Sequence, residues 1–151
     1  MSGGDTLILS SGIRIAALPL THVLETMRPL PIEPLAGSLP FVDGVAVVRG
    51  TPVPVVNVEV LLGGGSRGSV NRFVSVRAGE RTVALAVSEV LGVWPSEALG
   101  IGELPPLLEG AVADAVQALG RLDGRLLTVL RAASLVSSEV WNEIAAHGRG
   151  R

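Results

Sequence analysis

The most direct candidate for catalytic chemistry is a glycine-rich run at residues 64–68, Gly-Gly-Ser-Arg-Gly. It matches the G-x-S-x-G pattern, in which a strand turns sharply into a helix and exposes a nucleophilic serine. Here residues 70–77 favour a strand instead of a helix, and a Gly/Ser-rich linker produces such a match through composition alone. We therefore interpret Ser66 as a linker residue and keep a serine hydrolase as a remote alternative, which the esterase activity of a Ser66→Ala variant would test.

Other patterns for catalysis or ligand binding are incomplete. The two histidines, His22 and His147, are too few and too distant for a zinc site in a chain without Cys. His22 falls where an exposed strand end is expected, and the carboxylates of Asp43 and Glu59 belong to different predicted elements. Residues 100–102 lack the third glycine and the helix of a dinucleotide-binding loop. The sequence predicts no catalytic, cofactor-binding or metal-binding residue, and hence no enzyme.

Composition points to a folded protein that does not bind nucleic acid. The 151 residues are 48% hydrophobic and 17% charged, which is enough to form a core. The net charge is −2, Lys is absent and aromatic residues are 3%, so the basic field and the stacking residues of nucleic-acid binders are missing. Absence of Cys suits a reducing compartment. No apolar run reaches the roughly 18 residues of a spanning helix. We expect a cytoplasmic protein without direct membrane insertion.

The two halves of the chain resemble each other. Residues 7–25 and 74–92 align without a gap at a spacing of about 67 residues. The matches include Gly12 with Gly79, Arg14 with Arg81, and Val23-Leu24 with Val90-Leu91. Each half is therefore predicted to be one copy of the same small unit, with a seam between the copies where binding is expected.

Short apolar runs separated by turn residues predict an all-β fold. The predicted strands are residues 7–9, 13–20, 45–49, 73–77, 82–87, 116–122 and 125–130. The alternation of Val56, Val58 and Val60 predicts one more. Asp123-Gly124 is the clearest turn, because both residues tolerate the positive φ of a tight hairpin. Many short strands at near-regular spacing are typical of a barrel or a sandwich.

Three segments are not expected to form strands. Residues 28–40 contain four prolines and predict an extended loop without a strand ladder, or less plausibly a PxxP ligand. Residues 63–69 form a flexible linker, which divides the chain into approximate subdomains at 7–62 and 70–136. Residues 137–147 predict a helix with one apolar face, capped at its start by Ser137 or Ser138 and ended by Gly148.

Several short sequence segments, taken together in the order in which they occur, resemble the CheW-like family of chemotaxis coupling proteins across residues 7–136. The pieces are Val23 and Glu25, the turn through Phe41 and Gly44, the Arg49-Gly50 pair followed by Pro54-Val55, and the late Asp123-Gly124. The resemblance implies a single domain over residues 1–151, built from two intertwined SH3-like five-stranded β-barrels with a short C-terminal helix. It implies a non-catalytic adaptor that bridges methyl-accepting chemoreceptors to the regulatory domain of a CheA-type histidine kinase. An adaptor of a separate motility or signalling pathway is the alternative.

The resemblance fails at four places. Similar proteins carry Asn-Leu where Val47-Val48 stand and an acidic residue at the positions of Asn57, Ser88 and Arg131. If those carboxylates cap turns, the changes are structural. If they face a partner, the chain couples to a different receptor or kinase.

Arg49 and Gly50 are the best candidate contacts for a partner. Gly allows a partner backbone to approach, and Arg offers a planar fork to carboxylate or carbonyl groups. The alternative is a surface ion pair of Arg49 with Glu25 or Asp43. The remaining candidate partner-binding residues are Glu25, Gly44, Val42, Val45 and Val47, with the three valines expected to line an apolar groove for an amphipathic helix.

Overall fold

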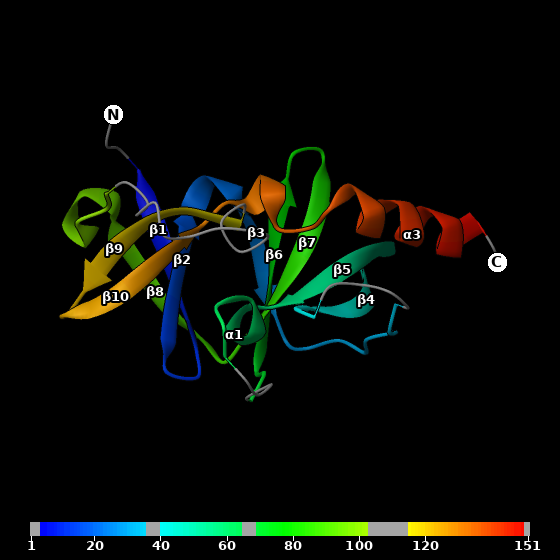
Figure 1. Ribbon diagram of the computed structural model, residues 1–151, viewed down its shortest axis with the longest axis horizontal. Helices are drawn as coiled ribbons and strands as arrows, with labels where there is room; N and C mark the ends of the chain where they lie inside the picture. Colours follow the sequence, from blue (N-terminus) through cyan, green and yellow to red (C-terminus); the bar gives the residue numbers. More distant parts are fainter. Residues whose placement is uncertain (1–3, 36–39, 65–68, 103–114, 150–151) are drawn as a thin grey trace.

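The computed structural model describes residues 4–35, 40–64, 69–102 and 115–149, and for residues 147–149 it describes the backbone alone. Figure 1 shows an elongated molecule in which two β-sheets lie side by side and a helix runs along one of them to the C-terminus. The strands are β1 (Asp5–Ser11), β2 (Arg14–Pro19), β3 (Val23–Met27), β4 (Val42–Val48), β5 (Thr51–Asn57), β6 (Arg72–Ala78), β7 (Arg81–Val87), β8 (Glu89–Pro95), β9 (Val116–Leu122) and β10 (Arg125–Leu130). The helices are α1 (Val58–Leu61) and α3 (Ser138–Arg149), with 3₁₀ turns η1 (Leu20–His22), η2 (Ser96–Leu99) and η3 (Ala132–Ser134).

The strands form two five-stranded sheets, which confirms the predicted all-β fold with a C-terminal helix. Sheet A has the order β8-β1-β2-β10-β9, and sheet B has the order β3-β6-β7-β5-β4. Within each sheet one pair is parallel, β2 with β10 in sheet A and β5 with β7 in sheet B. All other pairs are antiparallel.

Each sheet takes strands from both halves of the chain. Sheet A combines β1 and β2 with β8, β9 and β10, whereas sheet B combines β3, β4 and β5 with β6 and β7. Residues 7–62 and 70–136 therefore do not each form one barrel, as the repeat alone suggested. The reason is that the parallel pairs join a hairpin from one half to a hairpin from the other. The predicted intertwining of the two five-stranded units agrees with this strand order.

The repeat survives as equivalent positions in the two sheets. Ser11 pairs with Arg14 in sheet A as Ala78 pairs with Arg81 in sheet B. Val129 pairs with Ala17 across the parallel strands of sheet A, and Val55 pairs with Ala84 across those of sheet B. Arg125 pairs with Leu122 beside the β9–β10 turn of sheet A, and Thr51 pairs with Val48 beside the β4–β5 turn of sheet B. Sheets A and B are thus two versions of one strand arrangement.

The hydrophobic core has three parts. The interior of sheet A contains Ile8, Ile15, Ala17, Leu99, Ala118, Leu127 and Val129. The interior of sheet B contains Ala46, Val48, Val53, Val55, Phe73, Ala84 and Ala86. The third part, the seam core, joins side chains of both sheets, among them Leu7, Leu9, Leu18, Val74, Val83 and Leu85. Because these side chains are at most 5% exposed, much of the seam is closed core instead of an open binding surface.

The hairpin turns follow the sequence closely. Asp123 and Gly124 have φ angles of 49° and 76° between β9 and β10, which confirms the predicted tight hairpin. Arg49 and Gly50 have φ angles of 52° and 80° at the equivalent place between β4 and β5. Arg49 therefore adopts a left-handed conformation that Asp and Asn tolerate better than Arg.

Three local predictions were wrong in part. The strand expected through Val56, Val58 and Val60 ends at Asn57, whose side-chain oxygen accepts a hydrogen bond from the Val60 amide at 3.0 Å and caps helix α1. The predicted strands also omitted β3 and β8, which lie at the sheet edges and alternate between partly buried and exposed side chains.

The proline-rich segment and the C-terminal helix differ from their predictions in detail. Glu33 makes one bridge with Val45 through two backbone hydrogen bonds of 2.8 Å, although no ladder was expected there. Ser137 caps α3 by accepting a hydrogen bond from the Val140 amide at 3.4 Å. The helix continues through Gly148 to Arg149, so Gly148 does not end it.

Candidate functional site

The candidate partner-binding residues all belong to one part of sheet B, on β3, β4 and the β4–β5 turn. Val47 is 61% exposed on the outer face of β4. Val42 and Val45 are only 4% and 7% exposed and belong to the packed interior, so they do not line an open groove. The strand has a register shift between Val42 and Gly44, which changes the face that each side chain occupies.

Gly44 has a structural reason to be glycine. Its φ is 142°, and a Cβ atom there would overlap the backbone carbonyl of Glu33. The neighbouring Val45 exchanges both backbone hydrogen bonds with Glu33. Gly44 is therefore buried beneath the proline-rich segment and allows that segment to approach β4.

Arg49 and Glu25 form a bidentate ion pair between the β4–β5 turn and β3. The Nε of Arg49 donates to Oε2 of Glu25 at 2.7 Å, and Nη2 donates to Oε1 at 2.8 Å. The Arg49 side chain is 78% exposed and that of Glu25 is 32% exposed. This pairing is one of the two alternatives that the sequence left open for Arg49.

The ion pair shifts the pKa of both groups in the direction that favours their charged forms. The hydrogen bond from Arg49 holds the pKa of Glu25 below its ordinary value, with help from charge attraction and against partial desolvation. The same hydrogen bond and attraction raise the pKa of Arg49. Both groups therefore stay charged at neutral pH, and the fork of the guanidinium is held in one orientation.

Exposed apolar side chains lie near this pair and at the equivalent place in sheet A. Leu24 precedes Glu25 on the edge strand β3 and is exposed. Leu91 and Val93 are exposed on β8, the equivalent edge strand of sheet A. The candidate list from the sequence missed these three residues. The repeat contained the signal, because Val23-Leu24 aligns with Val90-Leu91.

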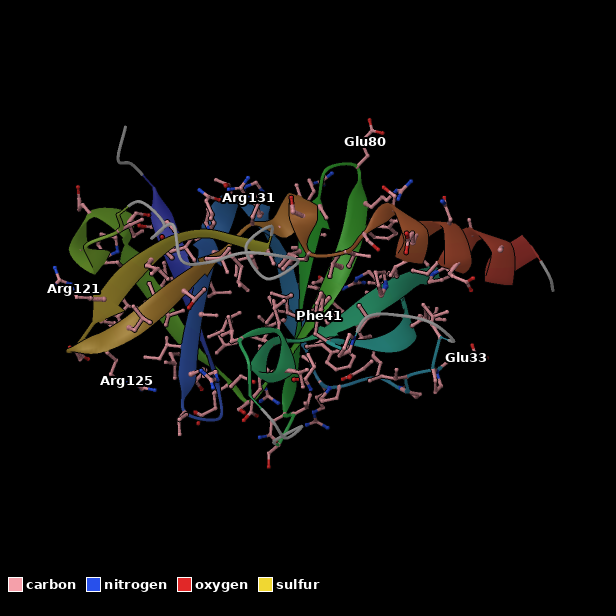
Figure 2. All side chains as sticks on the ribbon, in the orientation of Figure 1. Glu33, Phe41, Glu80, Arg121, Arg125 and Arg131 are labelled. Carbon is pink, nitrogen blue, oxygen red and sulfur yellow. The ribbon has the colours of Figure 1, made fainter. Side chains whose placement is uncertain are left out.

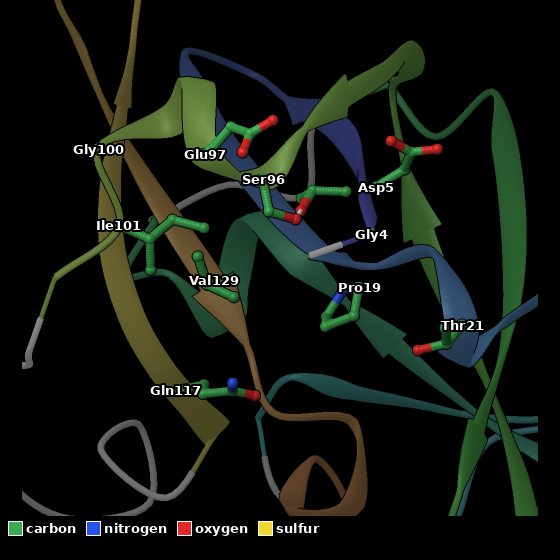
Figure 3. Close-up of a pocket in the computed structure, with 11 residues that line it drawn as sticks. Gly4, Asp5, Pro19, Thr21, Ser96, Glu97, Gly100, Ile101, Gln117 and Val129 are labelled. Atoms are coloured by element: carbon green, nitrogen blue, oxygen red, sulfur yellow. Dashed lines mark hydrogen bonds between the residues drawn. The ribbon is translucent and has the colours of Figure 1, made fainter. Parts of the chain in front are cut away.

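A separate cavity of about 480 Å³ lies at one end of sheet A (Figure 3). The carboxylates of Asp5 and Glu97 and the amide of Gln117 line it together with Ile101 and Val129. Among the described residues, no group of three or more His, Asp or Glu side chains is placed to hold a metal ion.

The other residues considered for catalysis belong to separate elements or lie outside the described residues. Ser66 lies outside the described residues. His22 is exposed at the end of η1, and Asp43 and Glu59 belong to β4 and α1 respectively.

The positions where an acidic residue was expected differ in their surroundings. Asn57 caps α1 and also donates a hydrogen bond of 3.4 Å to Asp43. The hydroxyl of Ser88 donates to the carbonyl of Ser69 at 2.9 Å and accepts from the amide of Gly12 at 3.3 Å. Both side chains thus hydrogen-bond to backbone groups at turns and segment ends, in line with the structural alternative. Arg131 is exposed, and its backbone amide donates to Ala115.

The family model for the CheW-like domain matches residues 5–140, which includes both sheets and the start of α3. The chain belongs to the CheW-like domain family. Comparison with curated proteins gives no match. The CheW-like fold is also found in a solved structure, the scaffolding protein TtCheW from Thermoanaerobacter tengcongensis, with a TM-score of 0.70 and 22% identity. The similarity covers 87% of this chain and 90% of that protein.

Within the described part of this CheW-like chain, the helices are too short or too polar to cross a membrane.

Proposed function

We propose that this CheW-like chain is a non-catalytic adaptor that couples chemoreceptors to a CheA-type histidine kinase in the cytoplasm. The observation that carries the proposal is the family match over residues 5–140, nearly the whole described chain. The fold shared with a protein named as a scaffold supports it. The physical requirement for an adaptor is a rigid body with separate binding surfaces, and the closed seam core favours such rigidity.

The surface around Arg49 is our candidate for the receptor tip. The ion pair with Glu25 orients a guanidinium that remains largely exposed, and the strands that flank the pair in sequence carry the exposed apolar side chains of Leu24 on β3 and Val47 on β4. An amphipathic helix would complement this surface, because its apolar face can cover the apolar side chains and the polar groups along its flank can bind the guanidinium. Arg49 also adopts a strained backbone conformation, which is more often retained at functional sites than elsewhere.

Binding of an Arg49→Glu variant tests this assignment. We expect the variant to lose measurable binding to an isolated receptor-tip helical hairpin, because a charge reversal opposes both the partner and Glu25. Thermal unfolding should change little, since exposed ion pairs contribute little to stability. The matched control is Arg77→Glu, at an exposed arginine of β6.

Unchanged binding of the Arg49→Glu variant would refute the role of Arg49. Loss of the fold would instead assign Arg49 to structure. Failure of the wild-type chain to bind either a receptor tip or a kinase regulatory domain would contradict the adaptor function itself.

The exposed Arg131 favours a second candidate within the same class, an adaptor for a different kinase or pathway. A basic side chain stands there in place of an expected acidic one. If Arg131 contacts the kinase, the Arg131→Asp variant will bind a conventional CheA-type regulatory domain more tightly than the wild type. Equal binding would leave Arg131 without a role in partner choice.

A further inference from the structure

The cavity at the end of sheet A has a buried floor and an open rim. Thr6 of β1 and Val129 of β10 are only 2% and 3% exposed, and Pro19 and Ser96 are half-buried. The Oγ1 of Thr6 lies 2.6 Å from the Oγ of Ser96, so the two hydroxyls share a hydrogen bond and keep lone pairs that can accept others. The floor therefore combines an apolar surface with hydrogen-bond acceptors.

Polar side chains form the rim of this cavity. Asp5, Thr21, Glu97 and Gln117 are exposed residues that line the same space. Figure 3 shows Asp5 and Glu97 at one side of the opening and the Gln117 amide at the other. Among the described residues, neither carboxylate has an ion-pair or hydrogen-bond partner. Both carboxylates are therefore available to a ligand.

The lining of the cavity carries a net negative charge. It contains the two carboxylates and no Arg or His side chain. Arg121 of β9, labelled in Figure 2, is close to one lining residue, since a Cβ atom on Gly100 would be 3.7 Å from its Nε. Arg121 makes no ion pair with Asp5 or Glu97, however, and does not line the cavity. Two carboxylates without a cationic partner favour a positively charged ligand.

Sheet B is filled at the equivalent place. The hairpin registers pair Thr6 with Pro19 in sheet A and Phe73 with Ala86 in sheet B. The ring of Phe73 is fully buried, and partly buried apolar side chains pack against the cluster that contains it. Sheet A has the smaller and polar Thr6 instead. The cavity is therefore a property of this copy of the strand arrangement.

We propose that this cavity binds a small organic cation, an alkylammonium or alkylguanidinium group. Its N–H groups would donate to the carboxylates of Asp5 and Glu97 and to the side-chain oxygen of Gln117, and its alkyl part would cover Val129 and Pro19. Such a cation has donors and no acceptors, which suits a lining rich in acceptors. The volume of about 480 Å³ lies within the range of small-molecule sites.

Two sources supply this chemistry, a free amine or guanidine and the side chain of a lysine or arginine on a partner protein. The cavity belongs to sheet A, whereas the proposed receptor contact at Arg49 belongs to sheet B. The inference therefore does not rest on the adaptor function, and either proposal can fail without the other.

Titration of the isotope-labelled full chain with butylguanidinium and with butylammonium tests the proposal. Each cation should cause saturable amide shifts at residues 4–6, 96–97 and 117, which line the cavity. Butylurea has nearly the same shape as butylguanidinium without its charge, and it should bind more weakly. Added salt should weaken the binding of the cations, because their attraction to exposed carboxylates is screened.

Two isosteric variants test the carboxylates. Asp5→Asn and Glu97→Gln should each weaken the binding of butylguanidinium by about twofold to fivefold, the effect of one exposed ion pair. The double variant should bind more weakly than either. Glu89→Gln is the matched control, at an exposed carboxylate of β8 that does not line the cavity, and it should bind as the wild type does. Thermal unfolding of the variants should be nearly unchanged, since the substituted side chains are exposed.

A blocked peptide with one central arginine distinguishes the two sources. Tighter binding of this peptide than of butylguanidinium, lost when glutamine replaces the arginine, would assign the cavity to the side chain of a partner protein. Exclusion of the peptide while butylguanidinium binds would assign it to a free small molecule. The Arg49→Glu variant should bind the cations as the wild type does, which separates this inference from the receptor contact.

Three results would overturn the proposal. Absence of saturable shifts at the lining residues would mean that the cavity takes no such ligand. Equal affinity for butylurea and butylguanidinium would mean that the charge is not recognised. Unchanged binding by the double variant of Asp5 and Glu97 would mean that the carboxylates do not hold the cation.

Discussion

Sheets A and B have the same strand order and the same registers, yet they differ in what covers them. The proline-rich segment crosses β4 of sheet B through Glu33, and α3 lies over β5 and β7. In sheet A, Gly102 makes the equivalent bridge with Leu119 of β9, so among the described residues the two sheets differ chiefly in the cover that α3 provides. The repeated unit thus provides the framework, and the segments added to one copy decide which surfaces remain free for partners.

The two sheet interiors also differ at one equivalent position. Phe73 of sheet B is fully buried and is the largest such side chain in the described structure. Sheet A has Thr6 there, also buried, with its hydroxyl 2.6 Å from the Ser96 hydroxyl. Sheet B is filled by an aromatic ring, whereas sheet A uses a polar contact beside the cavity in Figure 3.

The largest effect is expected from Phe73→Ala. Removal of a fully buried aromatic ring should lower the free energy of unfolding by about 3–5 kcal/mol. Thr6→Ala, at the equivalent position, should cost only about 1 kcal/mol for the lost hydrogen bond. Urea denaturation of both variants measures the difference. Because the sheets share the seam core, each variant should unfold in one transition, and two separate transitions would contradict that coupling.

A smaller effect is expected from Gly44→Ala, which tests the cover over β4. The added Cβ would overlap the Glu33 carbonyl at a φ that L-residues rarely adopt, so we expect a loss of about 1–3 kcal/mol. The equivalent residue in sheet A is Ala118, which pairs with Val129 as Gly44 pairs with Val55. Ala118→Gly should cost no more than about 1 kcal/mol. Equal losses in denaturation experiments would show that the proline-rich segment does not constrain β4.

The smallest effect concerns the pH dependence of the pair on sheet B. The Glu25 pKa is lowered chiefly by the hydrogen bond from Arg49, so the pair contributes stability above the unfolded-state pKa of Glu and loses it as the pH falls through the folded-state value. Wild type should therefore be slightly more stable than Arg49→Gln at pH 7, and the difference should shrink as the pH falls below the ordinary pKa of Glu and vanish below the lowered folded-state value. Denaturation at several pH values measures this. A difference that persists in acid would assign the effect of Arg49 to something other than the pair, and Arg77→Gln provides the control.

Local features of the fold could be predicted from the sequence, but the exchange of strands could not. Asp123-Gly124 and Ser137 act through their own neighbours, so their turn and cap are visible in short windows. The pairing of β2 with β10 joins segments more than 100 residues apart and leaves no local pattern. At Asn57 a short-range pattern gave the wrong prediction. The alternating valines after it predicted a strand, but the Asn57 side chain caps helix α1 there instead.

The candidate site was predicted in part. The opposite charges of Arg49 and Glu25 made their pairing a reasonable alternative, and the structure contains it. Val42 and Val45 were misplaced, because a register shift and a covering segment cannot be seen in valine periodicity.

The strand exchange sets an order for folding during synthesis. Every strand of sheet B has been made once Val87 is added, whereas β1 and β2, the first to be made, must await β8, β9 and β10. Until then Leu7, Leu9 and Leu18 can meet only the face of sheet B that will become the seam core. The β1–β2 hairpin would thus pack against sheet B through the seam core before β8 and β10 are available to pair with it in sheet A. The finished sheet B would serve as its template.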